Sequence, residues 1–243
     1  MKNSSIFKTL AIVLSIGLLT FSCTKNDEPT TNISDEEVVE ILTSALGTNN
    51  SVSLIYEAQE IALLANQYTI KSTENDFCDT PQDSSWMFGY AGANISADYA
   101  VNWGWTVNCN GFIPISVAVN TNSAGSFNTQ RLASSSESQG SWYIDNLVGG
   151  SNFVLAGTYE WDGSSAFEGR NQDRSFDSKI NFEASDFELS KQELTLQSGT
   201  MTFAMMGTIT DGSTYSVVGS VEFVGNDKII ITINDKIYEV DLG

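Results

Sequence analysis

Glu160 and Asp162 are the two residues whose types and spacing come closest to a catalytic pair. They stand on either side of Trp161, and residues two apart on a β-strand point to the same face. Two carboxylates on one face could serve as the acid and the nucleophile of a glycosidase. Asp98 and Asp145 are further candidates. Because the chain has 30 Asp and Glu residues, a pair of this kind also arises by chance, and we favour a solvated surface here.

Histidine is absent from the chain. Its absence excludes Ser-His-Asp and Cys-His catalysis as well as imidazole metal ligands. Calcium suits oxygen-rich loops, and such oxygens occur in Asn171, Asp173, Asp177 and the turn Asn226-Asp227. No EF-hand spacing accompanies them, and Asn and Asp are ordinary residues of turns. We therefore expect a protein that is not an enzyme and that holds neither a metal nor a cofactor.

Two tryptophans and two arginines remain as candidates for ligand binding. Trp103 and Trp105 share one face of a predicted strand with apolar neighbours, so we expect them to fill the core. The alternative is a platform on which a sugar stacks. Arg170 and Arg174 could grip a carboxylate or a phosphate of a ligand, although ion pairs with the surrounding acids are favoured.

The charge balance restricts the partners. The chain carries 11 Lys and Arg against 30 Asp and Glu, which gives a net charge of −19. Phosphate backbones would repel such a chain, and no basic stripe is present to overcome the repulsion. Nucleic acid is therefore excluded, and electrostatic attachment to anionic lipid headgroups is disfavoured.

The first residues have the composition of a secretory signal. Lys2 and Lys8 are followed by an uncharged apolar stretch up to Phe21. The run Leu18-Leu19-Thr20-Phe21-Ser22-Cys23 resembles the lipobox of bacterial lipoproteins, in which the cysteine thiol receives a diacylglycerol before the signal is removed. The resemblance implies a mature chain that begins at Cys23 and is held on a membrane by its lipid. No other stretch approaches the length of a transmembrane helix.

The other two cysteines are Cys78 and Cys109. With Cys23 modified by lipid, two cysteines of an exported protein favour one disulfide between them. A metal or redox site is the alternative, but the chain has no CxxC spacing and no histidine to support it.

Helical spacing predicts a helical hairpin over residues 34–72. Ser34 and Glu37 form a capping box, and apolar residues recur at helical spacing up to Gly47. A second helix begins near Ser51. Its predicted apolar face contains Leu54, Ile55, Ala58, Ile61, Ala62 and Ala65. Glu57 is predicted to lie elsewhere on the helix.

From about Trp86 onward the apolar residues alternate with polar ones, which indicates antiparallel strands with one buried face. The alternation extends from Val101 to Cys109 and from Ile113 to Val119, and it recurs further along the chain. Asp211-Gly212, Gly225-Asn226-Asp227 and Asn234-Asp235 separate successive strands as hairpin turns do. The stretch Ser134 to Gly140, rich in Ser, predicts an exposed loop.

The predicted fold is therefore mainly β: an N-terminal helical hairpin packed on a curved antiparallel sheet, in the form of a meander, a sandwich or a half-open barrel. The predicted divisions are a lipoprotein signal peptide (1–22), a lipidated tether (23–33), the hairpin (34–72) and an antiparallel β domain (73–243).

The order of these features resembles a family of uncharacterised outer-membrane lipoproteins of the Bacteroidetes. Within the tether, Thr24-Lys25-Asn26-Asp27-Glu28-Pro29 is similar to the short acidic tag that directs such lipoproteins to the outer face of the outer membrane. The other resembling segments are strand and turn patterns: Cys78 with Trp103–Cys109, Gly157-Thr158-Tyr159, Arg170-Asn171-Gln172, Ile231–Asn234 and Tyr238–Leu242. The resemblance implies a location on the outer membrane, facing the cell exterior, and no assigned activity.

These observations predict a lipid-anchored envelope or surface protein that binds a glycan or a protein without catalysis. A periplasmic carrier of apolar molecules is the alternative, because a half-open sheet covered by helices resembles the concave folds of lipoprotein chaperones. A carboxylate-dependent glycosidase is less favoured.

Overall fold

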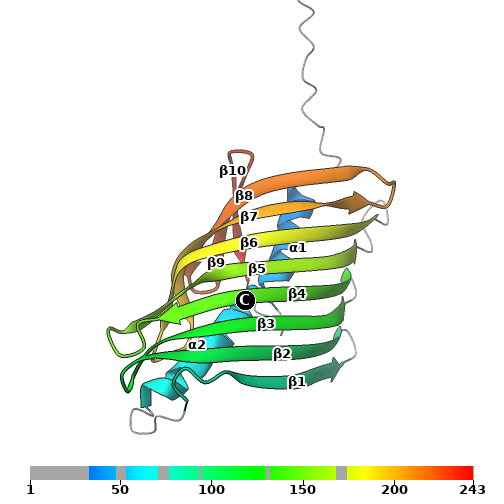
Figure 1. Ribbon diagram of the computed structural model, residues 1–243. Helices are drawn as coiled ribbons and strands as arrows, with labels where there is room; N and C mark the ends of the chain where they lie inside the picture. The colour runs from blue at the N-terminus through cyan, green and yellow to red at the C-terminus, as the bar shows by residue number, and fades with distance from the viewer. Residues whose placement is uncertain are drawn as a thin grey trace, which may run out of the picture. The chain divides into compact units, whose positions relative to one another are not determined.

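The computed structural model describes residues 33–47, 53–70, 77–92, 95–129, 132–167 and 174–242, which belong to one compact unit. Two helices precede ten strands (Figure 1). The elements are α1 (Asp35–Leu46), α2 (Leu54–Ile70), β1 (Gln82–Ala91), β2 (Ile95–Asn110), β3 (Ile113–Thr129), β4 (Leu132–Asp145), β5 (Asn152–Phe167), β6 (Arg174–Ser190), β7 (Leu196–Ile209), β8 (Thr214–Gly225), β9 (Lys228–Ile233) and β10 (Lys236–Asp241).

The strands form one open antiparallel sheet in which the order in space is the order in sequence, β1 to β10. The prediction of a mainly β, antiparallel fold is confirmed, and among the forms considered the sheet is a meander. The three predicted hairpin turns connect β7 to β8, β8 to β9 and β9 to β10. Asn226, Asp227, Asn234 and Asp235 have positive φ angles, as the tight turns of twisted hairpins require.

Alternation along each strand divides the sheet into two faces, which we call inward and outward. The inward face carries the apolar core, as in Phe153, Leu155, Tyr159 and Trp161 of β5, which are all buried. The outward face carries exposed polar side chains. In the view of Figure 1 both helices lie behind the sheet, which is the inward side.

The predicted alternation is wrong for Ile113 and Ile115, which are 53% and 40% exposed. The pairing of β2 with β3 shifts between Asn108 and Cys109, and Ile115 has no partner in the resulting register. Such a bulge interrupts the pleat and turns the residues before it out of phase with Val117 and Val119.

The predicted loop from Ser134 to Gly140 is also wrong, because these residues lie inside β4. Most of their partners in the register are small as well, such as Gly125 opposite Ser136, and on β5 the large aromatic partners are Trp161 opposite Ser138 and Tyr159 opposite Gly140. Ser138 is buried and its hydroxyl is 2.5 Å from the hydroxyl of Ser123 on β3. Small residues here pair with both neighbouring strands rather than form a loop.

The first turn of α1 contacts two distant strands. Ser34 caps the helix, and the predicted capping box with Glu37 is confirmed. The other oxygen of Glu37 accepts a hydrogen bond from Arg174 of β6 at 2.8 Å. Asp35 accepts one from Lys236 of β10 at 2.6 Å, and this bond lowers the pKa of Asp35. In a flat sheet, β6 and β10 would lie roughly 19 Å apart. Asp35 and Glu37 are only two residues apart in α1 and yet they contact both strands, so the sheet curves around the start of α1.

Helix α2 lies against β3, β4, β5 and β7. Near its end, the Tyr68 hydroxyl accepts a hydrogen bond from Trp105 Nε1 on β2 at 2.9 Å and donates one to Gln82 of β1 at 3.3 Å. Just before β1, Cys78 and Cys109 form a disulfide, as the cysteine count predicts. No helix among the described residues has the length and apolar character needed to cross a membrane.

Candidate functional site

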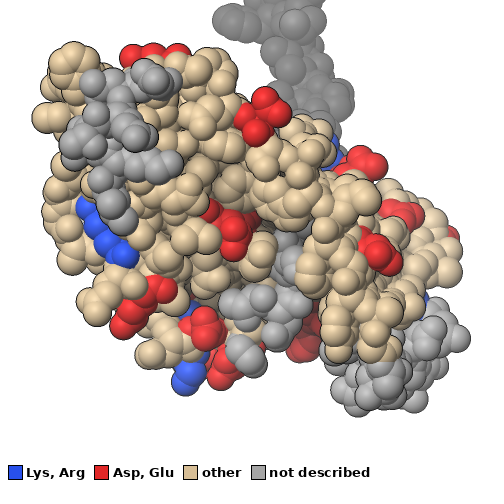
Figure 2. All heavy atoms as spheres, turned by 90° about the horizontal axis from the view of Figure 1, so that it is seen from below, with Lys and Arg blue, Asp and Glu red and all other residues tan. Residues whose placement is uncertain are grey.

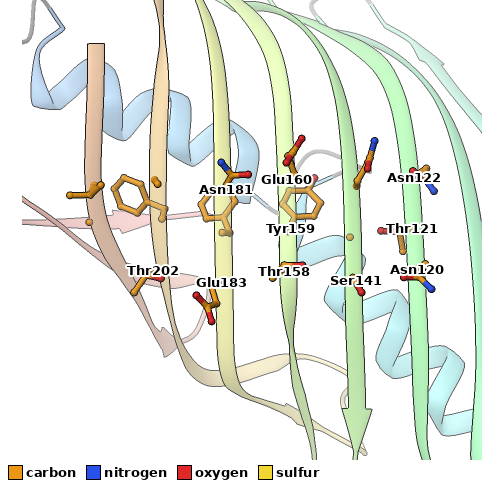
Figure 3. Close-up of a pocket in the computed structure, with 17 residues that line it drawn as sticks. Asn120, Thr121, Asn122, Ser141, Thr158, Tyr159, Glu160, Asn181, Glu183 and Thr202 are labelled. Carbon is orange, nitrogen blue, oxygen red and sulfur yellow. The ribbon is translucent and has the colours of Figure 1, made fainter.

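The outward face is hollowed across the middle of the sheet, from β3 to β8 (Figure 3). The hollow has a volume of about 960 Å³ and is open to solvent. A space of this size accommodates a ligand of several rings. We take this outward hollow as the candidate site.

Two rows of polar side chains border the outward hollow. Because residues two apart on a strand point the same way, each of β3 to β6 contributes one polar side chain to each row, and β7 adds Thr202 to one of them. The register aligns them across neighbouring strands, and Figure 3 shows the rows on either side of Thr121 and Tyr159. One row contains Asn120, Ser141, Thr158, Glu183 and Thr202, and the other contains Asn122, Gln139, Glu160 and Asn181.

Residues of the inward face form the floor between the rows. Thr121, Gly140, Tyr159, Phe182, Phe203 and Gly219 also line the hollow, and the side chains of Thr121, Tyr159, Phe182 and Phe203 are buried. The aromatic rings of this floor pack within the core, as Tyr159 does against Phe182 with ring centroids 6.1 Å apart and ring planes inclined by 38°. A ligand in the hollow would meet amides, hydroxyls and carboxylates over β3 to β6, and Thr202 with the apolar side chains of Ala204 and Val218 over β7 and β8.

A buried carboxylate lies directly beneath this floor. Glu57 of α2 is 5% exposed. Its Oε1 accepts hydrogen bonds from the Thr121 hydroxyl, at 2.5 Å, and from Trp142 Nε1. Gly140 provides the space, since a β-carbon at this position would overlap Glu57, Thr121 and Trp142. Thr121 and Gly140 thus belong both to the outward hollow and to the surroundings of Glu57.

Burial raises the pKa of Glu57 to about 7, although the hydrogen bonds from Thr121 and Trp142 act in the opposite direction. Desolvation of a carboxylate disfavours its charged form, and here it outweighs the two donors. Burial and the nearby charge of Glu57 also raise the pKa of the Tyr159 hydroxyl.

The sequence reasoning missed Glu57, because it placed this residue away from the apolar face of the helix. That interpretation is wrong. Glu57 follows Leu54 by three residues and precedes Ile61 by four, and both spacings put side chains on one helix face. The spacing was therefore the signal that could have identified it.

The two tryptophans predicted as core residues or as a stacking platform lie on the inward side. Trp103 is 7% exposed and packs against Trp86, with ring centroids 5.3 Å apart. Trp105 is half-buried and donates its hydrogen bond to Tyr68 of α2. Neither residue borders the outward hollow.

The two arginines are placed differently. Arg174 bonds Glu37 of α1, a partner far away in sequence, and its guanidinium lies 5.3 Å from the centre of the Phe176 ring. Arg170 lies outside the described residues, and so does Cys23, the predicted lipidation site.

Glu160 and Asp162 do share the outward face, but Trp161 between them is buried on the other face. Glu160 lines the outward hollow and forms an ion pair with Lys179 of β6 at 2.5 Å. Asp162 lies two residues further along β5, where it pairs with the same Lys179 in the register. The three side chains thus form a charged group at one end of the hollow.

Within the described ranges, no three acidic or cysteine side chains gather as a metal site would require. In Figure 2, which views the molecule from below, acidic side chains are more prominent than basic ones. At the outward hollow, the carboxylates of Glu160 and Glu183 would repel an anionic ligand. The rest of its polar lining consists of neutral amides and hydroxyls, which donate and accept hydrogen bonds.

Comparisons of the chain with protein-family models, with curated proteins and with solved structures found no match. Inference about its function therefore rests on the chain's own residues and geometry.

Proposed function

We propose that this chain is a lipid-anchored lipoprotein of the outer membrane whose β domain is a non-catalytic binding module. The observation that carries the proposal is the outward hollow, with its two rows of hydrogen-bonding side chains. The anchor is inferred from the run that ends at Cys23 and from the acidic residues after it. In this proposal the two helices form a hairpin that packs on the curved sheet, on the side opposite the outward hollow.

The ligand class follows from the lining. Amides and hydroxyls donate and accept hydrogen bonds, and Glu160 and Glu183 accept them from hydroxyl groups. A neutral, hydroxyl-rich molecule matches the polar rows better than an anion does, and its carbon-bound faces can lie against Ala204 and Val218. We therefore assign a neutral glycan as the ligand, lying along the rows and across the strands.

Binding should depend on side chains of the hollow and not on their neighbours outside it. We expect the double variant Asn181→Ala/Thr202→Ala to bind roughly ten times more weakly than the wild type, because each lost hydrogen bond costs about 0.5–1.5 kcal/mol. The measurement is titration calorimetry of the full-length protein with the neutral oligosaccharide that it retains best from an array. Thr200→Ala is the matched control: Thr200 is exposed on the same strand, two residues before Thr202, and does not line the hollow.

Equal loss in the Thr200→Ala control, or no retained oligosaccharide, would contradict the assignment of a glycan to this hollow. If the domain bound a protein partner and no glycan, we would assign binding to a surface other than the outward hollow.

The proposed location makes a separate prediction. A C-terminal epitope tag should be removed by protease added to intact cells, because the domain would face the exterior. Cys23→Ala should abolish incorporation of labelled palmitate and release the protein from the membrane fraction. Protection of the tag until the cells are lysed would place the domain in the periplasm and contradict the exterior orientation.

A further inference from the structure

Glu57 joins helix α2 to the centre of the sheet by groups from three different elements. Its carboxylate accepts from Thr121 of β3 and Trp142 of β4 and lies near the hydroxyl of Tyr159 on β5. In the described part of the chain, the groups that shift its pKa include no lysine or arginine. A buried carboxylate without a cation is stable when neutral and costly when ionised.

The titratable groups around Glu57 are few. From the sheet, Tyr159 of β5 faces it, and Tyr99 of β2 lies beside Tyr159. On its own helix, Glu60 lies one turn further on and interacts with Tyr56. Burial raises the pKa of Tyr159 and of Tyr56, so both hydroxyls stay neutral over the range in which a carboxyl group titrates. The charge that changes at this contact is therefore the charge of Glu57.

We propose that Glu57 is a pH-responsive latch that fastens α2 to the sheet firmly in acid and loosely at neutral pH. The latch does not depend on the proposed ligand. When α2 leaves the sheet, apolar residues of the inward face and of the helix become exposed to solvent, so the latch controls access to that face.

The direction follows from the pKa of Glu57, which is about 7 in the closed state against an ordinary value of 4.5 in water. Below pH 4.5 the carboxyl group is neutral in both states, and the latch has its full strength. Between these values the open state loses its proton first, so opening becomes tenfold easier for each pH unit. Above pH 7 both states are ionised, and opening stays at its highest level.

Hydrogen exchange of the α2 amides measures this opening directly. In the full-length wild type, we expect the opening constant to rise by one to two orders of magnitude, roughly, between about pH 5 and about pH 8, after correction for intrinsic exchange rates. Glu57→Gln keeps an acceptor for Thr121 and Trp142 but cannot ionise, so its opening constant should change less than about threefold. A wild-type opening constant that does not change with pH, or an equal rise in Glu57→Gln, would overturn the proposal.

Glu60→Gln is the matched control, because Glu60 lies on the same helix but is only partly buried. It should keep the wild-type rise, and loss of the rise in this variant would assign the latch to the wrong carboxyl group. An NMR titration of Glu57 in the wild-type protein tests the proposal without any substitution. The carboxyl carbon of Glu57 in the wild type should show an NMR midpoint near pH 7, and a midpoint more than about one pH unit below this value would overturn the proposal.

Discussion

Replacing both Cys78 and Cys109 with serine should lower the free energy of unfolding by about 3–4 kcal/mol. The disulfide joins residues 31 positions apart, and the cross-link reduces the conformational entropy of the unfolded chain. In the folded protein it also ties the segment before β1 to the end of β2, where the Asp79 amide donates to the Val107 carbonyl at 2.8 Å. The measurement is urea unfolding of the variant and of the oxidised wild type under the same conditions.

Two controls separate the cross-link from the substitutions. Wild-type protein treated with reductant should lose a similar amount of stability, whereas Cys23→Ala should lose none, because that residue takes no part in the disulfide. A loss below about 1 kcal/mol in the double variant would show that the unfolded chain is already compact around this loop.

The substitution Gly140→Ala, which adds a single carbon, should lower the free energy of unfolding by about 2–3 kcal/mol. The β-carbon of Gly140→Ala would overlap the Glu57 carboxylate, the Thr121 hydroxyl and the Trp142 indole. None of these groups can move freely, because all three residues are buried and both Thr121 and Trp142 donate hydrogen bonds to Glu57. The loss is measured by chemical denaturation of the variant at about pH 5. At this pH Glu57 is neutral in the folded protein, so the free energy of unfolding contains no cost of a buried charge.

Gly104→Ala is the matched control for Gly140→Ala. Both glycines lie within strands, but a β-carbon at position 104 would lie 3.9 Å from its nearest neighbour, the Gln82 carbonyl oxygen. We expect this variant to change the free energy of unfolding by less than about 1 kcal/mol. Combining Gly140→Ala with Glu57→Ala should recover part of the loss, because the shortened side chain frees the space. Equal effects of the two glycine substitutions would contradict the crowding at Gly140.

Alternation and turn residues predict most of the sheet, because both depend on local chemistry. Buried Phe153, Leu155, Tyr159 and Trp161 follow the predicted face of β5, and the turn at Asn234-Asp235 lies where its residue types indicate. The amino-acid composition of a segment predicts the wrong structure where its local preference differs from what its neighbours in the fold require. Ser134 to Gly140 belong to a strand because the register pairs every one of them with β3 and with β5, and this pairing outweighs the local turn preference of serine and glycine.

The candidate site could be predicted only in part. The outward polar residues are visible in the alternation, but the hollow depends on how the sheet curves and on a register spanning six strands. Glu57 was recoverable from its spacing with Leu54 and Ile61. Its partners Thr121 and Trp142 were not recoverable, because they lie 64 and 85 residues away along the chain.

The order of the strands has a consequence for how the chain folds. Since each strand pairs with the strand before it, the sheet can grow hairpin by hairpin while the chain emerges from a ribosome or a translocon. The two helices emerge first, yet the strands that contact Glu57 follow much later. The apolar sides of the helices that pack on the sheet therefore stay exposed to solvent until β3 to β5 have been synthesised. During this interval a chaperone would have a binding surface on the nascent chain that the finished protein no longer presents.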